Sequence, residues 1–215
     1  NGTVSCWGAN ANGQLGDGKT EGKTTSTAVK GLTGAVAIAA GGAFTCAMMG
    51  DGSVVCWGAN TAGQIGNGAK ASGQLEPALV IGTIIPRVPI ASNDAFTCAT
   101  KYDGQVACWG DNSGGQLGVL TSSKFRHMAS PVAGAQGIRA LITGQVHTCA
   151  LNEQGLVHCW GNNDNGQLGD GTKIAKSTPT LVKGLTGVHA ISSRDNTTCA
   201  VTTAGVAQCW GLNDN

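Results

Sequence analysis

Short apolar runs alternate with glycine-rich polar stretches along the chain. AVAIAAGG (residues 35–42) is an apolar run that a glycine pair ends, and its length suits one strand. The runs AFTCAMM (43–49) and SVVCWGAN (53–60) flank the residues GDG, which is typical of a β-hairpin with a three-residue turn. A polar loop then leads to EPALVIG (76–82), a short strand with a proline near its start. Helical periodicity is almost absent, so this stretch predicts four short strands.

The pattern recurs with a nearly constant period. The motif Cys-Trp-Gly begins at Cys6, Cys56, Cys108, Cys159 and Cys209, at intervals of 50, 52, 51 and 50 residues. A fixed period of this size indicates a repeat architecture. Four-stranded units repeated along one chain indicate an all-β fold, either β-propeller blades or another β-repeat fold.

The repeats divide one expected domain, residues 1–215, into blades of four short antiparallel strands. We expect a partial blade at 1–34, blades at about 35–84, 85–136 and 137–187, and a partial blade at 188–215. These are about four and a fraction repeats.

Four cysteine pairs test the predicted hairpin, because the members of each pair are ten residues apart. The pairs are Cys46/Cys56, Cys98/Cys108, Cys149/Cys159 and Cys199/Cys209. A turn at 50–52 places Cys46 opposite Cys56 in a non-hydrogen-bonded pair, where facing side chains come closest. The third turn residue, which favours left-handed backbone, is glycine in all four copies: Gly52, Gly104, Gly155 and Gly205.

We therefore expect four disulfides, which require such close cysteines. Zinc is the alternative, but a zinc site would favour C-x₂-C pairs, which the sequence lacks. Disulfides form in oxidising compartments, so we expect a secreted, extracellular or cell-surface protein.

Cys6 is left unpaired by this pattern. Its partner would lie ten residues earlier, at a position that the numbering does not contain. We expect a chain that is a piece of something longer. The alternative is a free thiol or one that pairs with another molecule.

The motif W-G-x-N-x-x-G-Q-[L/I]-G, preceded by a strand with T-C-A, resembles the repeat of the regulator of chromosome condensation family. The matching residues begin with Trp7, Gly8, Asn10, Gly13, Gln14, Leu15 and Gly16, and they recur from Trp57, Trp109 and Trp160; Trp210, Gly211 and Asn213 begin a fifth set. The resemblance covers essentially the whole chain. It implies a β-propeller, in that family usually of seven blades, so we expect the four and a fraction repeats to be part of a larger propeller. The paired cysteines resemble a secreted bacterial branch.

The residues of the repeated motif are predicted to have a structural role. Tryptophan buries a large apolar face and needs one partner for its N–H. Asparagine suits turns, glycine permits close approach, and leucine or isoleucine fills the gap between neighbouring blades, since one repeat cannot bury its own apolar face. The motif therefore determines the fold and leaves the function open.

Composition and charge exclude several classes of protein. Charged residues make up 12% of the chain and the net charge is +1, so we expect no nucleic-acid partner. No apolar run of about 18 residues occurs, so we expect no membrane insertion.

Catalytic and metal-binding motifs are also missing from the sequence. It contains no G-x-S-x-G, no H-E-x-x-H and no phosphate-binding Gly-Lys-Ser loop. NNDNGQLGDG resembles a calcium loop at first sight, but Gly161 and Thr172 stand where its two terminal carboxylates should be. His147 stands in the slot of Phe44 and Phe96, which favours packing. We expect no enzyme, no cofactor and no metal.

The repeats differ most after each G-Q-[L/I]-G, which is where binding should lie. The segment VLTSSKFRHMAS (119–130) departs furthest and contains Phe125, Arg126, His127 and Met128. Aromatic residues, arginine and methionine are enriched in interface cores, so these four residues are the candidate partner contacts. The alternative is that Phe125 packs onto its own blade. Tyr102, at a predicted hairpin tip, is a second candidate.

Two Asn-x-Thr sequons, at Asn1 and Asn196, are possible glycosylation sites if the host glycosylates. Together these features predict a secreted, disulfide-stapled β-propeller that acts as a non-catalytic protein-binding scaffold. The family resemblance supports this, because known members include an exchange factor for a small GTPase and a secreted inhibitor of β-lactamases. The first alternative is a structural unit of a cell-surface filament, adhesin or larger multidomain surface protein, with self-assembly or the rest of a longer chain as partner. A propeller enzyme or a carbohydrate binder is the weaker alternative.

Overall fold

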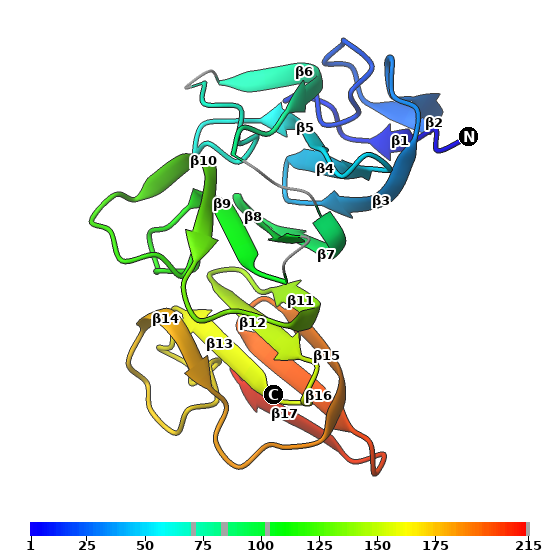
Figure 1. The fold of residues 1–215 in the computed structure, drawn as a ribbon. Coiled ribbons are helices and arrows are strands. Elements are labelled where there is room, and N and C mark those ends of the chain that lie inside the picture. Colours follow the sequence, from blue (N-terminus) through cyan, green and yellow to red (C-terminus); the bar gives the residue numbers. More distant parts are fainter. Residues whose placement is uncertain (70–71, 83–85, 102–103, 214–215) are drawn as a thin grey trace.

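The chain folds into a succession of small antiparallel sheets (Figure 1). The computed structural model describes residues 1–69, 72–82, 86–101 and 104–213. These residues form 17 strands in five sheets, and each strand of a sheet pairs with its neighbour in the chain. The expectation of an all-β fold built from four-stranded antiparallel units is confirmed.

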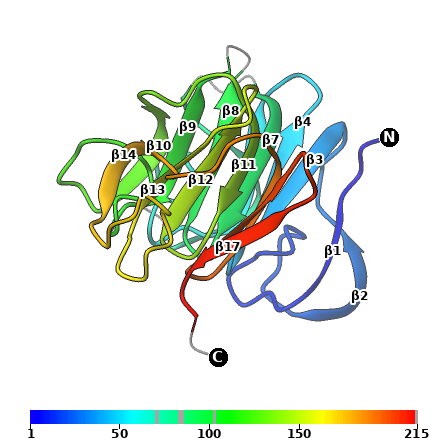
Figure 2. The same ribbon diagram turned by 90° about the horizontal axis from the view of Figure 1, so that it is seen from below.

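Three sheets have four strands each. They are β3 (Ala35–Ala40), β4 (Phe44–Met49), β5 (Val54–Ala59) and β6 (Gly73–Leu79); β7 (Pro86–Asn93), β8 (Phe96–Lys101), β9 (Val106–Asp111) and β10 (Phe125–Val132); and β11 (Ile138–Thr143), β12 (His147–Asn152), β13 (Val157–Gly161) and β14 (Lys176–Leu181). The first strand of each sheet is innermost, and β3, β7 and β11 lie side by side in Figure 2.

The first and last sheets are smaller. The first contains β1 (Ser5–Gly8) and β2 (Lys23–Ala28), which correspond to the third and fourth strands of a complete sheet. The last contains β15 (Val188–Arg194), β16 (Thr197–Thr202) and β17 (Ala207–Gly211), the first three strands of a sheet. No helix in the described part of the chain is long and apolar enough to cross a bilayer.

The central hairpin of each of the last four sheets has the register that the turn predicts. In the β4–β5 hairpin, Met49 N donates to Ser53 O and Gly52 N donates to Met49 O, both at 2.9 Å. The third turn glycines have φ of +86° (Gly52), +76° (Gly104), +75° (Gly155) and +78° (Gly205). This is the left-handed region that glycine adopts without strain.

The hairpin register brings the cysteines together. Cys46 faces Cys56 directly, and the same pairing recurs in the next three sheets. All four pairs are joined by disulfides with Cα atoms 4.1 Å apart. The first three disulfides are fully buried, so they are part of the core.

The apolar core lies between consecutive sheets. Trp109, which is fully buried, packs with Ile65 and Val80 of the preceding sheet. The same arrangement recurs where Trp160 meets Leu117 and Val132. Because each sheet covers its neighbour, the burial of one motif tryptophan depends on the sheet before it.

Candidate functional site

The repeated motif links each sheet to the preceding one. Each motif tryptophan from the second onward donates its indole N–H at 2.9 Å to the carbonyl oxygen of the motif glutamine one repeat earlier. The pairs are Trp57–Gln14, Trp109–Gln64, Trp160–Gln116 and Trp210–Gln167. The motif therefore acts through contacts between sheets.

The motif asparagine closes the loop that follows it. Asn163 accepts a hydrogen bond from Leu168 N at 3.0 Å, and its amide donates to the carbonyl oxygens of Thr172 and Ile174. Asn163 is fully buried. The loop that resembles calcium-binding sequence is thus held by an asparagine side chain.

The outer strand of each of the first four sheets contains a bulge that the sequence analysis missed. In β10, Arg126 faces Gly110 and Ser130 faces Cys108, so three residues of β10 lie opposite Trp109 alone. The same register shift occurs in β2, β6 and β14.

The bulge of β10 packs on the preceding sheet. Gly68 N donates to His127 O at 2.8 Å, and Ala129 N donates to Ile81 O at 3.1 Å. A side chain at Gly63 would collide with the His127 ring and the Arg126 carbonyl. The bulge therefore covers the preceding G-Q-[L/I]-G loop. Its residues belong to their own sheet and also contact the sheet before it.

The four predicted contact residues lie together at this bulge. A cleft of about 330 Å³ is lined by Gly68, Phe125, Arg126, His127, Met128, Ala129 and Ser130. Phe125 is 42% exposed and Met128 is 51% exposed, so Phe125 is not tucked into the core of its own blade. Arg126 Nε and His127 Nδ1 are buried and have no hydrogen-bond partner among the described residues.

The surface beside this cleft is apolar, whereas the equivalent surface between the first two sheets carries an ion pair. Between the first two sheets, Lys30 Nζ and Glu76 Oε1 form an exposed salt bridge at 2.6 Å. The corresponding positions at the next boundary are Ile81 and Met128, both about half exposed and both adjacent to Gly68. The second and third sheets therefore meet at two apolar side chains in the place where the first and second sheets meet at an ion pair.

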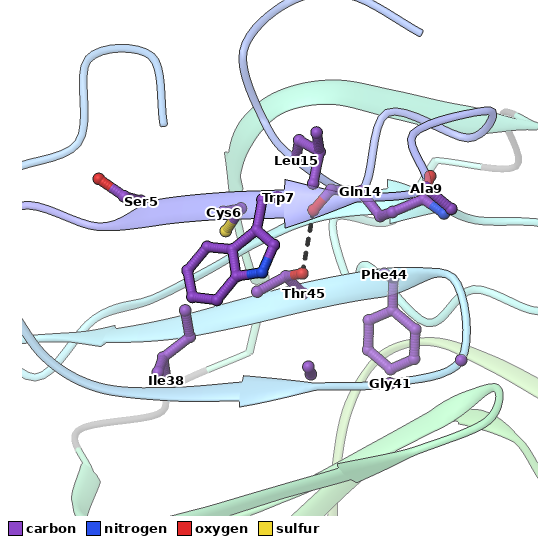
Figure 3. Close-up of a pocket in the computed structure, with 12 residues that line it drawn as sticks. Ser5, Cys6, Trp7, Ala9, Gln14, Leu15, Ile38, Gly41, Phe44 and Thr45 are labelled. Atoms are coloured by element: carbon purple, nitrogen blue, oxygen red, sulfur yellow. Dashed lines mark hydrogen bonds between the residues drawn. The ribbon is translucent and has the colours of Figure 1, made fainter. Parts of the chain in front are cut away.

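A second cleft, of about 290 Å³, lies along β1 (Figure 3). Cys6 and Trp7 line it from one side, and Ile38, Phe44 and Thr45 line it from the sheet that follows. Trp7 is 67% exposed, whereas its counterparts Trp57, Trp109 and Trp160 are fully buried. Cys6 is the one free cysteine of the described residues, and burial raises the pKa of its thiol.

His147 lies in the core, as its place in the repeat predicts. It is fully buried, and its Nε2 lies 2.8 Å from Thr198 Oγ1. Thr198 donates its own proton to Gln167 O at 3.1 Å, so His147 Nε2 carries the proton and donates to Thr198. Burial lowers the pKa of His147 to about 4, so the ring is neutral near pH 7 and serves as a packed polar side chain.

The other candidates are dispersed. Tyr102 lies outside the described residues. Asn1 is exposed, while Asn196 is half-buried, with its Oδ1 3.4 Å from Gln167 Nε2. In the described ranges, no three His, Cys, Asp or Glu side chains gather where they could hold a metal ion.

Comparison with known proteins shows the family. Two sequence models of the regulator of chromosome condensation repeat match the chain, one over residues 1–48 and 154–201 and the other over 35–64 and 90–116. The chain belongs to the regulator of chromosome condensation repeat family. The sheets described above are therefore regulator of chromosome condensation repeats, and the links between tryptophan and glutamine lie between successive repeats.

Relatives in this family differ in length and role. The ultraviolet-B receptor UVR8 of Arabidopsis thaliana is 30% identical over 184 residues, which cover 83% of this chain and 42% of the receptor. The E3 ubiquitin-protein ligase HERC2 of Homo sapiens is 37% identical over 97 residues, which cover 44% of this chain and 2% of the ligase. The chain thus spans less than half the length of either relative.

The fold is also similar to solved structures. Prp20p from Saccharomyces cerevisiae, described with its binding to Gsp1p and histones, superimposes with a TM-score of 0.82 at 26% identity. The match covers 98% of this chain and 53% of Prp20p. Human WBSCR16 has the same TM-score at 23% identity, with 96% of this chain and 56% of that protein covered, and it shows the likeness of fold alone.

Proposed function

We propose that this chain is a non-catalytic protein-binding scaffold of an oxidising, extracellular compartment, and that its partner binds the cleft along β10. The observation that carries the proposal is the meeting of exposed Phe125 and Met128 with the partly exposed Arg126 and His127 in one cleft. Exposed apolar surface beside polar side chains is what a bound partner would cover.

The chemistry of the cleft suggests what the partner presents. The Arg126 guanidinium is always a donor, so a carbonyl or carboxylate oxygen of the partner would satisfy it. Phe125, Met128 and the adjacent Ile81 would cover an apolar side chain of the partner. Protein binding is supported by the similarity to Prp20p, which is described as binding Gsp1p and histones. The four disulfides support the proposed compartment.

The test compares matched surface variants in partner capture. Wild-type protein is used to capture partners from the extracellular fraction of its source, and the captured protein is purified and titrated by calorimetry. We expect the double variant Phe125→Ser/Met128→Ser to raise Kd about tenfold or more, as buried interface anchors do.

The matched control is the double variant Ile174→Ser/Leu181→Ser. These side chains are 65% and 48% exposed, and they lie one repeat further along the chain. The control should bind like the wild type, and both double variants should keep the wild-type melting temperature. Equal Kd values for the β10 variant and the wild type would remove this cleft from the interface.

A further inference from the structure

The motif asparagine of the third repeat has fewer hydrogen-bond partners than its counterparts. In the first repeat, Asn10 Nδ2 donates at 3.2 Å to Asp17 Oδ1, seven residues later, and to two backbone carbonyl oxygens. The fourth repeat has the same bonds, with Asp170 as the acceptor side chain. In the third repeat, Asn112 Nδ2 makes one bond, to Ser123 O at 3.4 Å. Because an amide nitrogen has two N–H groups, one N–H of Asn112 has no acceptor among the described residues.

The missing acceptor results from a difference in sequence. Val119 stands seven residues after Asn112. The other repeats have a side chain with an oxygen atom at this place: Asp17, Asn67 and Asp170. Valine accepts no hydrogen bond, and Val119 packs instead against the apolar core between the third and fourth sheets. The third repeat therefore has the asparagine amide but no carboxylate of its own to accept from it.

A cleft of about 430 Å³ lies at this amide, between the third and fourth sheets. It is lined by Asn112 and by the loop 121–124 on one side, and by Asn162 and Ser177 on the other. Asn112 itself is buried. Both sheets have all four strands, so complete repeats form the two walls of the cleft.

Lys124 supplies a cation at the same cleft. The other repeats have small residues at this place: Gly22, Ser72 and Ala175. The repeat that lacks the motif carboxylate is thus the one with a lysine at the cleft. Lys124 forms no ion pair with a described residue. The carboxylate of Asp111, beside Asn112 in the chain, accepts hydrogen bonds from Ser113 and Gln116 instead.

We propose that this cleft is a binding site for a carboxylate, which takes the place of the missing motif aspartate. One carboxylate oxygen accepts the second N–H of Asn112, as the aspartate does in the first repeat, and Lys124 provides the opposite charge. The exposed hydroxyl groups of Ser122 and Ser177 are further donors. The carboxylate comes from an acidic side chain of a protein partner or from a small free acid. The site is separate from the β10 cleft and does not rest on the proposed function.

The test uses two probes that share a carboxylate. One is the peptide acetyl-Leu-Gly-Asp-Gly-Thr-amide, copied from residues 168–172, and the other is acetate. A control peptide has asparagine in place of the aspartate, which keeps the size and removes the charge. Each probe is titrated into the 215-residue chain at constant ionic strength. The NMR signals of the Asn112 side-chain amide give the Kd of each probe.

We expect the aspartate peptide to bind about tenfold more tightly than the asparagine peptide, because only the former makes charge-assisted hydrogen bonds. Lys124→Gln should raise the Kd of the aspartate peptide about threefold or more. Lys183→Gln is the matched control, because Lys183 is an exposed lysine outside the cleft, and it should leave this Kd unchanged.

A second variant should fill the site from within the chain. Val119→Asp/Leu120→Gly restores the Asp-Gly sequence that the first and fourth repeats have at this place. The introduced carboxylate should accept from the Asn112 amide, so this variant should lose peptide binding and keep at least the wild-type melting temperature.

The relative Kd values distinguish the two sources of the carboxylate. A lower Kd for the aspartate peptide than for acetate would assign the site to a partner's side chain, and equal Kd values would assign it to a small free acid. Equal binding of the aspartate and asparagine peptides would overturn the proposal. Full peptide binding by a folded Val119→Asp/Leu120→Gly variant would overturn it as well.

Discussion

Trp160 donates its indole N–H at 2.9 Å to the carbonyl oxygen of Gln116, which also accepts a hydrogen bond from Thr148 Oγ1 at 2.8 Å. One carbonyl thus receives two donors from the next sheet, and the tryptophan ring fills the gap between the sheets. This relationship joins consecutive repeats into one folded unit, because the indole of one repeat is held by the backbone of the repeat before it.

Removal of the indole N–H should lower the free energy of unfolding at a buried motif tryptophan but not at an exposed one. Trp160→Phe keeps an aromatic ring but removes the N–H and leaves a small cavity, so we expect the free energy of unfolding to fall by about 1–3 kcal/mol. Trp7→Phe is the matched control, because Trp7 is 67% exposed and should change the free energy by less than about 0.5 kcal/mol. Urea unfolding followed by circular dichroism measures both. Equal losses in the two variants would contradict the role given to the link between sheets.

Removal of a buried disulfide should destabilise the chain by a similar amount. In the double variant Cys149→Ala/Cys159→Ala, the lost link spans ten residues, which corresponds to about 2–3 kcal/mol of unfolding free energy. Cys6→Ala, which breaks no disulfide of the described residues, should leave stability unchanged. Thermal melts of both variants under non-reducing conditions test this. A melting temperature of the double variant equal to that of the wild type would show that the hairpin needs no covalent link.

His147 should make stability depend on pH. Burial lowers its pKa from 6.5 to about 4 in the folded chain, so between these values the unfolded chain binds a proton that the folded chain does not. The contribution of His147 to stability is therefore complete above about pH 6.5 and falls by about 3 kcal/mol as the pH drops to about 4.

His147→Phe should flatten this dependence, because Phe44 and Phe96 occupy the same place in the two preceding sheets. His189→Gln is the control, since His189 is exposed. The measurement is the urea midpoint of each variant from pH 4 to pH 8. A slope in His147→Phe equal to that of the wild type would assign the pH dependence to other groups.

Alanine substitution at two glycines should distinguish the stability cost of backbone strain from the cost of a packing collision. Gly169 and Gly184 have φ of +66° and +72°, so alanine at either position should cost about 1 kcal/mol in backbone strain. A Cβ at Gly169 would also lie 2.8 Å from Trp210 Nε1, whereas a Cβ at Gly184 would meet nothing within 4 Å. We expect Gly169→Ala to cost about 1–3 kcal/mol more than Gly184→Ala. Chemical denaturation gives the difference, and equal costs would mean that Trp210 can move away.

Local patterns in the sequence determined the strands, the hairpin register and the cysteine pairs. Cys46 and Cys56 are ten residues apart across one glycine turn, so turn length and strand alternation suffice to place them face to face. The four residues from Phe125 to Met128 also stood out by sequence, because they break a repeated pattern.

Tertiary structure alone decided what buries each motif tryptophan and where clefts form. Trp57 is covered by the carbonyl of Gln14, 43 residues earlier in the chain, and by apolar side chains of the preceding sheet, so its burial does not come from its own repeat. The β10 cleft likewise needs Gly68 and Ile81 of the preceding sheet beside the bulge at His127. A local pattern contains the turn and the strand, but it does not contain the neighbouring sheet that covers them.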